Sequence, residues 1–232
     1  MEYIIIGLVI VCPISVFVSY KYGFKKASEA FFDMLFKFGY ETKVKAFKIM
    51  NKTVKKGGIV FIGDSITQDY NVYEYFKGYD VYNRGIGGDT TLGLLNRLDV
   101  SVFELNPKKV FIQMGTNDLE LLDAKAYDIY ERMIEIVDKI KSFDQSIQIY
   151  MISIYPVNQH IDKQTVGKRS NEEIIQTNAL LKQIEGVSFI NIYDKLLESD
   201  VLNPAYTLEG LHLNQEGYQV VTKVLESYVK AS

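Results

Sequence analysis

An uncharged and strongly apolar run, Tyr3–Tyr20, stands at the N-terminus of the chain. Its length is close to what a helix needs to cross the hydrocarbon core of a bilayer. A cleaved signal peptide fits less well, because no basic residue precedes the run and no small-x-small cleavage site follows it. The pattern therefore predicts a single-pass transmembrane anchor in residues 1–26.

The charges beside this run are asymmetric. Three lysines follow it and none precedes it: Lys21, Lys25 and Lys26. Taken alone, the positive-inside rule places the rest of the chain in the cytoplasm.

Residues 27–56 form a second region with a helical pattern. Phe31, Leu35 and Phe38 recur at three-and-four spacing, and lysines become more frequent toward its end. The spacing predicts a juxtamembrane helix. This helix either lies on the bilayer surface or packs on the domain that follows, and the sequence leaves both arrangements open.

From Gly57 onward, short apolar runs alternate with stretches of helical periodicity. The expected strands are Ile59–Ile62, Tyr79–Tyr82, Val110–Met114, Ile147–Ile152 and Val187–Ile192. The expected helices are Leu92–Leu105, Ala124–Ser142, Glu172–Ile184 and Gln215–Val229. Near-continuous apolar strands with helices between them predict an α/β domain over residues 57–232, built on a five-stranded parallel sheet with helices on both faces. In such sheets the ligand site lies beyond the carboxyl ends of the strands.

Composition narrows the possible functions. The chain has 232 residues and a formal net charge of -3, so it lacks the basic surface that a nucleic acid partner requires. The single cysteine, Cys12, excludes an intramolecular disulfide. The only histidines are His160 and His212, so a histidine-dependent mechanism has two candidates for its base.

The sequence Gly63-Asp64-Ser65 directly follows the first expected strand. Glycine permits a sharp exit from the strand, and a serine at the start of the next helix is exposed at the sheet edge. A turn with an N-cap explains this triplet equally well when it is taken alone.

Two further loops also follow strands. The sequence after the second strand contains Gly87-Gly88, where backbone N–H groups can approach an oxyanion closely. The third strand is followed by Gly115-Thr116-Asn117, and the Asn117 amide can offer another N–H donor. An Asx-turn is the alternative role of Asn117.

The last candidate loop contains Glu209 and His212, immediately before the C-terminal helix. A carboxylate three residues before a histidine can hold the imidazole Nδ1–H and leave Nε2 facing a serine. His160 has no such neighbour, so a position in solvent or at the rim of the site is expected for it.

Together, and in this order, the Gly-Asp-Ser, Gly-Gly-Asp-Thr, Gly-Thr-Asn-Asp and Gly-Leu-His sequences resemble the four blocks of the SGNH hydrolase superfamily, also called GDSL lipases and acylhydrolases. The resemblance covers residues 57–230. It implies a three-layer, flavodoxin-like fold, with Ser65 as nucleophile and His212 as base. It further implies an oxyanion hole formed by the N–H groups of Ser65 and Gly88 and the Asn117 side chain, with no metal or organic cofactor.

One position departs from the pattern of the family, which usually has Asp where this chain has Glu209. Glutamate is one methylene longer and meets the imidazole from another direction. A Ser-His-Glu triad is workable chemistry. The alternative is a dyad in which Glu209 faces solvent and a backbone carbonyl holds His212.

The resemblance predicts a serine esterase that cleaves short-chain carboxylic esters through a Ser65 acyl-enzyme. The ester is a small molecule, a glycan or a lipid. Two alternatives stay open: an O-acyltransferase or O-acetylesterase that acts on cell-envelope glycans, and a non-catalytic module with the same fold. Enzymes of this family often act outside the membrane, so the side on which the domain lies also stays open.

Overall fold

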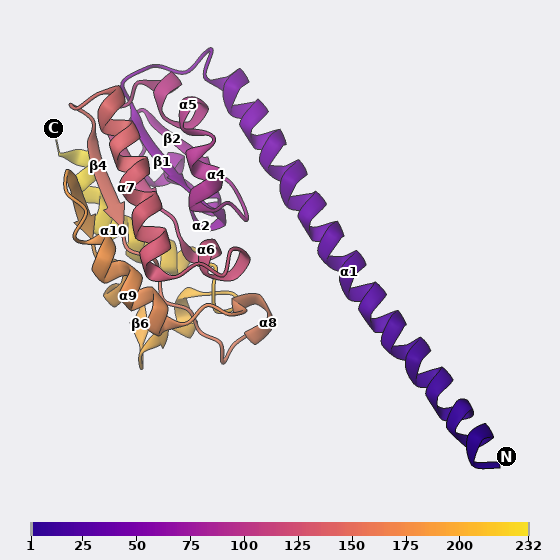
Figure 1. Ribbon diagram of the computed structural model, residues 1–232. Helices are drawn as coiled ribbons and strands as arrows, with labels where there is room; N and C mark the ends of the chain where they lie inside the picture. Colours follow the sequence, from indigo (N-terminus) through magenta and orange to yellow (C-terminus); the bar gives the residue numbers. More distant parts are fainter. Residues whose placement is uncertain (1, 232) are drawn as a thin grey trace. The chain divides into compact units, whose positions relative to one another are not determined.

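The computed structural model describes residues 2–231, apart from the side chains of residues 2–18, 29 and 33. Contacts divide the chain into two compact units, Met1–Glu41 and Thr42–Ser232. The first unit is helical, and the second contains the sheet and all the candidate site residues (Figure 1).

Helix α1 runs from Glu2 to Met50 without interruption. The predicted anchor, Tyr3–Tyr20, falls within it, and its side chains up to residue 18 lie outside the described residues. Within the described part of the chain, no helix is both long and apolar enough to cross a membrane. The rings of Phe31 and Phe38, from the predicted juxtamembrane region, are exposed.

The last residues of α1 belong to the second unit and pack on it. Phe47 is buried, and the guanidinium carbon of Arg84 lies 4.8 Å from the centre of its ring. Arg84 also donates a 2.7 Å hydrogen bond to Asn51 Oδ1, just beyond the helix. This end of the predicted juxtamembrane region is therefore part of the folded domain.

Five parallel strands form the central sheet in the order β2-β1-β3-β4-β5. They are β1 (Ile59–Gly63), β2 (Val81–Gly85), β3 (Lys109–Gln113), β4 (Gln148–Ile152) and β5 (Val187–Ile190). Strands β1 and β3 are buried throughout, as expected for a sheet covered on both faces. The predicted α/β fold with a five-stranded parallel sheet is confirmed.

Helices cover both faces of this sheet. They are α2 (Ser65–Asp69), α3 (Val72–Tyr75), α4 (Thr91–Leu95), α5 (Leu98–Ser101), α6 (Thr116–Leu121), α7 (Ala126–Phe143), α8 (Lys163–Val166), α9 (Asn171–Leu181) and α10 (Gln215–Lys230). Alternate residues of β1 point into two apolar cores. Val60 and Ile62 join α4, α5, α7 and α9, whereas Ile59 and Phe61 join α2, α3 and α10. Figure 1 shows α7 crossing the front of the sheet.

Short elements complete the domain. They are the 3-10 helices η1 (Phe103–Leu105), η2 (Tyr193–Lys195) and η3 (Pro204–Tyr206) and the antiparallel ribbon of β6 (Leu197–Glu198) and β7 (Val201–Leu202).

Two predicted elements need correction, and buried arginines explain both. The second strand is Val81–Gly85 and not Tyr79–Tyr82, because it continues through Arg84, whose side chain is buried against α1. The expected helix Leu92–Leu105 is broken into α4, α5 and η1. Arg97 stands at the break, with its guanidinium buried beneath the loop that follows β2.

Candidate active site

Ser65 is the first residue of α2, directly beyond the carboxyl end of β1. The preceding residue, Asp64, caps the helix by accepting a 2.9 Å hydrogen bond from the Ile66 N–H. Glycine is required at position 63, because a Cβ there would lie 2.4 Å from the Gln113 carbonyl oxygen. Ser65 thus lies at the edge of the sheet, beyond the carboxyl end of β1, and is partly exposed.

His212 lies on a tight loop that Thr207 closes. The Thr207 hydroxyl accepts a 2.9 Å hydrogen bond from the Gly210 N–H and donates a 2.7 Å bond to the His212 carbonyl. Gly210 has φ +88°, and a Cβ at this position would lie 2.2 Å from the Asn158 carbonyl oxygen. The loop thus depends on a glycine for both its turn and its contact with the neighbouring loop.

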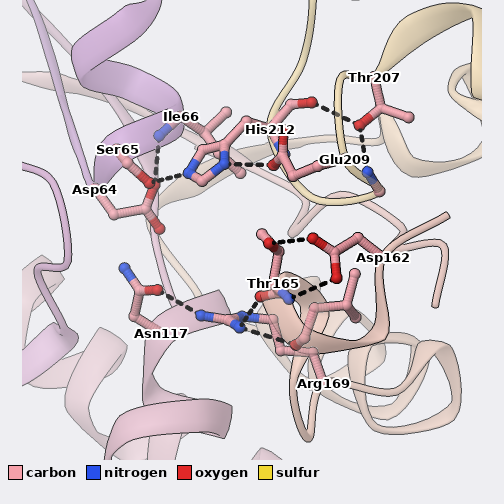
Figure 2. Close-up of polar contacts among 12 residues, drawn as sticks. Asp64, Ser65, Ile66, Asn117, Asp162, Thr165, Arg169, Thr207, Glu209 and His212 are labelled. Carbon is pink, nitrogen blue, oxygen red and sulfur yellow. Dashed lines mark hydrogen bonds and ion pairs between the residues drawn. The ribbon is translucent and has the colours of Figure 1, made fainter. Parts of the chain in front are cut away.

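Three side chains from these two loops form a continuous hydrogen-bonded chain (Figure 2). Ser65 Oγ lies 2.9 Å from His212 Nε2, and His212 Nδ1 lies 2.5 Å from Glu209 Oε1. A carboxylate only accepts hydrogen bonds, so Nδ1 carries the proton and Nε2 is free to accept one from the serine. An imidazole held this way can remove the serine proton as the hydroxyl attacks a carbonyl.

Of the two arrangements left open for Glu209, the structure has the one in which the carboxylate holds His212. The same Glu209 oxygen also accepts a 2.8 Å hydrogen bond from the His212 backbone N–H. The extra methylene of glutamate is therefore accommodated within the turn. His160 lies apart from this chain and is exposed, with its backbone N–H bonded to Asn158 Oδ1.

The predicted oxyanion donors come from three different loops. The Ser65 N–H is at the first position of α2, where a helix offers no carbonyl partner. Gly88 has φ +73° in the turn after β2. The Asn117 amide, on α6, donates one N–H to the Asp89 carbonyl at 3.0 Å, which leaves its second N–H available.

Sequence reasoning missed the buried charges that support these loops. The clearest is Arg169, which is 5% exposed and donates a 2.8 Å hydrogen bond to Asn117 Oδ1 (Figure 2). Below the loop after β2, Arg97 forms a 2.7 Å ion pair with Asp89, and both side chains are buried. Burial raises the pKa of Asp89, and the Arg97 charge opposes that rise. The sequence indicated only that the stretch through Arg169 lines the substrate side of the site, and charged residues are usually exposed, so no pattern predicted that these arginines are buried.

Two further carboxyl groups are buried close to the site. Asp118 accepts hydrogen bonds from the backbone and hydroxyl of Thr91, and burial raises its pKa. Asp64 is fully buried, and burial raises its pKa to about 7. Within the described structure its Oδ2 has no hydrogen-bond partner. A carboxyl group in this environment holds its proton at far higher pH than one in water.

The GDSL-like Lipase/Acylhydrolase family matches residues 61–220, which include every residue of the candidate site. The chain is 30% identical over 175 residues to N-acylneuraminate cytidylyltransferase of Escherichia coli O18:K1:H7, a match that covers 74% of this chain and 40% of that protein. The chain therefore corresponds to less than half of this relative. It is also 26% identical over 182 residues to human (Homo sapiens) platelet-activating factor acetylhydrolase IB subunit alpha2, covering 75% of this chain and 77% of that protein.

Solved structures are also similar to this chain. A Streptococcus pneumonia protein described as a platelet activating factor superposes with a TM-score of 0.82 and 30% identity, covering 87% of this chain and 98% of that one. An acylhydrolase from Bacteroides fragilis superposes with a TM-score of 0.69 and 27% identity, covering 78% and 92% of the two chains.

Proposed function

Because the chain belongs to the GDSL-like lipase/acylhydrolase family, we propose that it is a serine esterase acting through an acyl-enzyme on Ser65. The observation that carries the proposal is the unbroken hydrogen-bonded chain from Ser65 through His212 to Glu209. Each residue takes one role: Ser65 is the nucleophile, His212 the base, and Glu209 the group that orients and stabilises the imidazole.

In the first half-reaction, the Ser65 oxygen attacks the ester carbonyl while His212 Nε2 takes the hydroxyl proton. The carbonyl π electrons move onto oxygen, which becomes the oxyanion. As that oxyanion collapses, the ester C–O bond breaks and the leaving alcohol takes the proton from His212. In the second half-reaction, water attacks the acyl-enzyme, gives its proton to His212, and Ser65 leaves with that proton.

The oxyanion lies among three N–H donors, from the Ser65 backbone, the Gly88 backbone and the Asn117 side chain. Donors fixed in place before the reaction stabilise the developing charge without reorganising. Loss of one such donor costs about 3 kcal/mol of transition-state stabilisation, so Asn117→Ala is expected to lower kcat about a hundredfold or more.

Short acyl groups are the proposed substrates. The sequence neighbours of Ser65, Asn117 and His212 on one side, Ile66, Thr116 and Leu211, are already buried in the protein's own packing. These three residues therefore offer no apolar surface of their own to a long acyl chain. The acetylhydrolase name of the mammalian relative agrees with this preference.

A chain-length series of nitrophenyl esters tests both parts of the proposal. Turnover should be highest for acetyl to butyryl esters, and Ser65→Ala should abolish it without lowering Tm. A fluorophosphonate probe should label the wild type at Ser65 and leave the variant unlabelled. Equal turnover by the wild type and Ser65→Ala would refute Ser65 as the nucleophile. A turnover maximum at long acyl chains would refute short acyl esters as the substrates.

We further propose that the apolar run Tyr3–Tyr20 holds the enzyme at a membrane. Full-length protein should stay with the membrane fraction after an alkaline carbonate wash, whereas protein lacking residues 1–26 should be released and retain esterase activity. Protease treatment of intact cells then reports the side on which the domain lies. Release of the full-length protein by carbonate would contradict the anchor.

A further inference from the structure

Arg169 reaches the candidate oxyanion hole from the loop between α8 and α9, far from Asn117 in the sequence. Its Nη2 donates a 2.8 Å hydrogen bond to Asn117 Oδ1, and its Nε donates a 3.0 Å bond to the Thr116 carbonyl. The guanidinium therefore holds two neighbouring groups at the start of α6 at once. Arginine suits this task because its donors form a rigid planar fork.

The arginine is itself held firmly. Its Nη1 donates a 2.9 Å hydrogen bond to the Val166 carbonyl, and its charge lies 3.9 Å from Glu120. The Arg169 side chain is 6% exposed, and Asn117 is 5% exposed. Water cannot easily replace a bond between two groups that are buried to this extent, so the contact defines how the amide is oriented.

The orientation matters because an amide has one donor end and one acceptor end. As the structure has it, Oδ1 faces the guanidinium, and Nδ2 bonds to the Asp89 carbonyl and offers its second N–H to the site. A flipped amide would place its oxygen against the Asp89 carbonyl and its N–H groups against a cation. It would also present an acceptor to the oxyanion, which repels it.

We propose that Arg169 is a positioning residue of the oxyanion hole, which fixes the Asn117 amide with its N–H toward the reacting carbonyl and polarises that N–H with its charge. This role rests on the proposed esterase function. The hydrogen bonds of Arg169 go to Asn117, Thr116, Val166 and Thr165, and in this proposal it acts through Asn117. Its loss therefore removes stabilisation that exists mainly in the transition state, so kcat should fall while KM changes little.

A double-mutant cycle tests this role, with Arg169→Gln, Asn117→Ala and the double variant assayed on a nitrophenyl acetate substrate. Arg169→Gln should lower kcat about 10- to 100-fold, and Asn117→Ala should lower it at least as much. The double variant should be no slower than Asn117→Ala within about threefold, since Arg169 has nothing left to position. The rate of fluorophosphonate labelling should follow the same order, because its adduct also places an oxygen in the hole.

Two controls separate positioning from folding. Arg132→Gln removes another arginine near α6, one that pairs with Asp118 at 3.2 Å, and it should leave kcat within about threefold of the wild type. Arg169→Lys keeps the positive charge but has fewer hydrogen-bond donors, so its kcat should lie between those of the wild type and Arg169→Gln. If Arg169→Gln does not fold, Arg169→Lys replaces it in the double-mutant cycle.

These experiments distinguish failure of the positioning role from failure of the esterase function. Multiplicative losses in the double variant, or a drop in Tm with unchanged kcat for Arg169→Gln and Arg169→Lys, would overturn the positioning role while leaving the esterase intact. Absence of Ser65-dependent hydrolysis by the wild type would overturn the proposed function itself, and this role with it.

Discussion

One oxygen of Glu209 accepts two hydrogen bonds from His212, at 2.8 Å from its backbone N–H and at 2.5 Å from its ring Nδ1. The hydrogen bond from the His212 backbone N–H closes the turn and fixes the Glu209 carboxylate. The carboxylate is therefore positioned to accept the hydrogen bond from the imidazole ring. The orientation of the base is thus set by two residues of one turn, which lie three positions apart in the sequence.

Replacing Glu209 tests how much this carboxylate contributes. Glu209→Gln keeps the shape but removes the charge that stabilises the imidazolium in the transition state, so kcat should fall by about three orders of magnitude or more. Glu209→Asp keeps the charge with a shorter reach and should retain substantial activity. Steady-state kinetics on nitrophenyl acetate measures both, and a loss within about tenfold for Glu209→Gln would show that the carboxylate does not orient the base.

The two histidines give a simple contrast. His212→Ala removes the partner of Ser65 Oγ and should abolish ester hydrolysis and fluorophosphonate labelling. His160→Ala alters an exposed ring outside the hydrogen-bonded chain and should leave kcat close to that of the wild type. Loss of activity in His160→Ala, with activity kept in His212→Ala, would refute the assignment of the base.

The sequence predicted the sheet and the loops of the site because both depend on local signals. Apolar runs mark the strands, Gly-Asp-Ser and Gly-Gly mark sharp turns where strands end, and Gly-Leu-His marks the turn before the last helix. The burial of Arg97 and Arg169 escaped prediction because it depends on carbonyls and carboxylates distant in sequence. A single charged residue in a sequence gives no sign of such partners, and the expected helix Leu92–Leu105 failed for the same reason.

The turn at Gly210 offers a test of the loop that carries His212. Gly210→Ala adds a Cβ 2.2 Å from the Asn158 carbonyl oxygen at a φ of +88°, so it should displace the loop and lower both Tm and kcat strongly. Gly78→Ala is a matched control, because its φ is +90° but nothing lies within 4 Å of the added carbon. It should cost only the backbone strain, about 1 kcal/mol, with unchanged kcat. If Gly210→Ala and Gly78→Ala had equal effects on kcat, the contact with Asn158 would not be what holds the loop in place.

Asp64 predicts a specific dependence of stability on pH. Burial raises the pKa of its carboxyl group from 3.8 to about 7 in the folded protein. Between these values the folded protein keeps a proton that the unfolded chain releases. The free energy of unfolding therefore falls as pH rises from about 4 to about 7, and above that range the full loss persists.

Asp64→Asn removes this titration while keeping an oxygen that can accept the Ile66 N–H. Urea unfolding at pH 5 and pH 8 measures the effect in both proteins. Carboxyl groups that do not interact with Asp64 contribute equally to each protein, so the difference between the two proteins reports Asp64 and its coupling to Asp89 and Asp118. The free energy of unfolding of the wild type should fall by about 2 to 3 kcal/mol more between these pH values than that of Asp64→Asn, because about two pKa units of the shift lie between pH 5 and the folded pKa of about 7. An identical loss in the two proteins would show that Asp64 is ionised throughout this range, and that the N-cap beside the nucleophile carries a full negative charge.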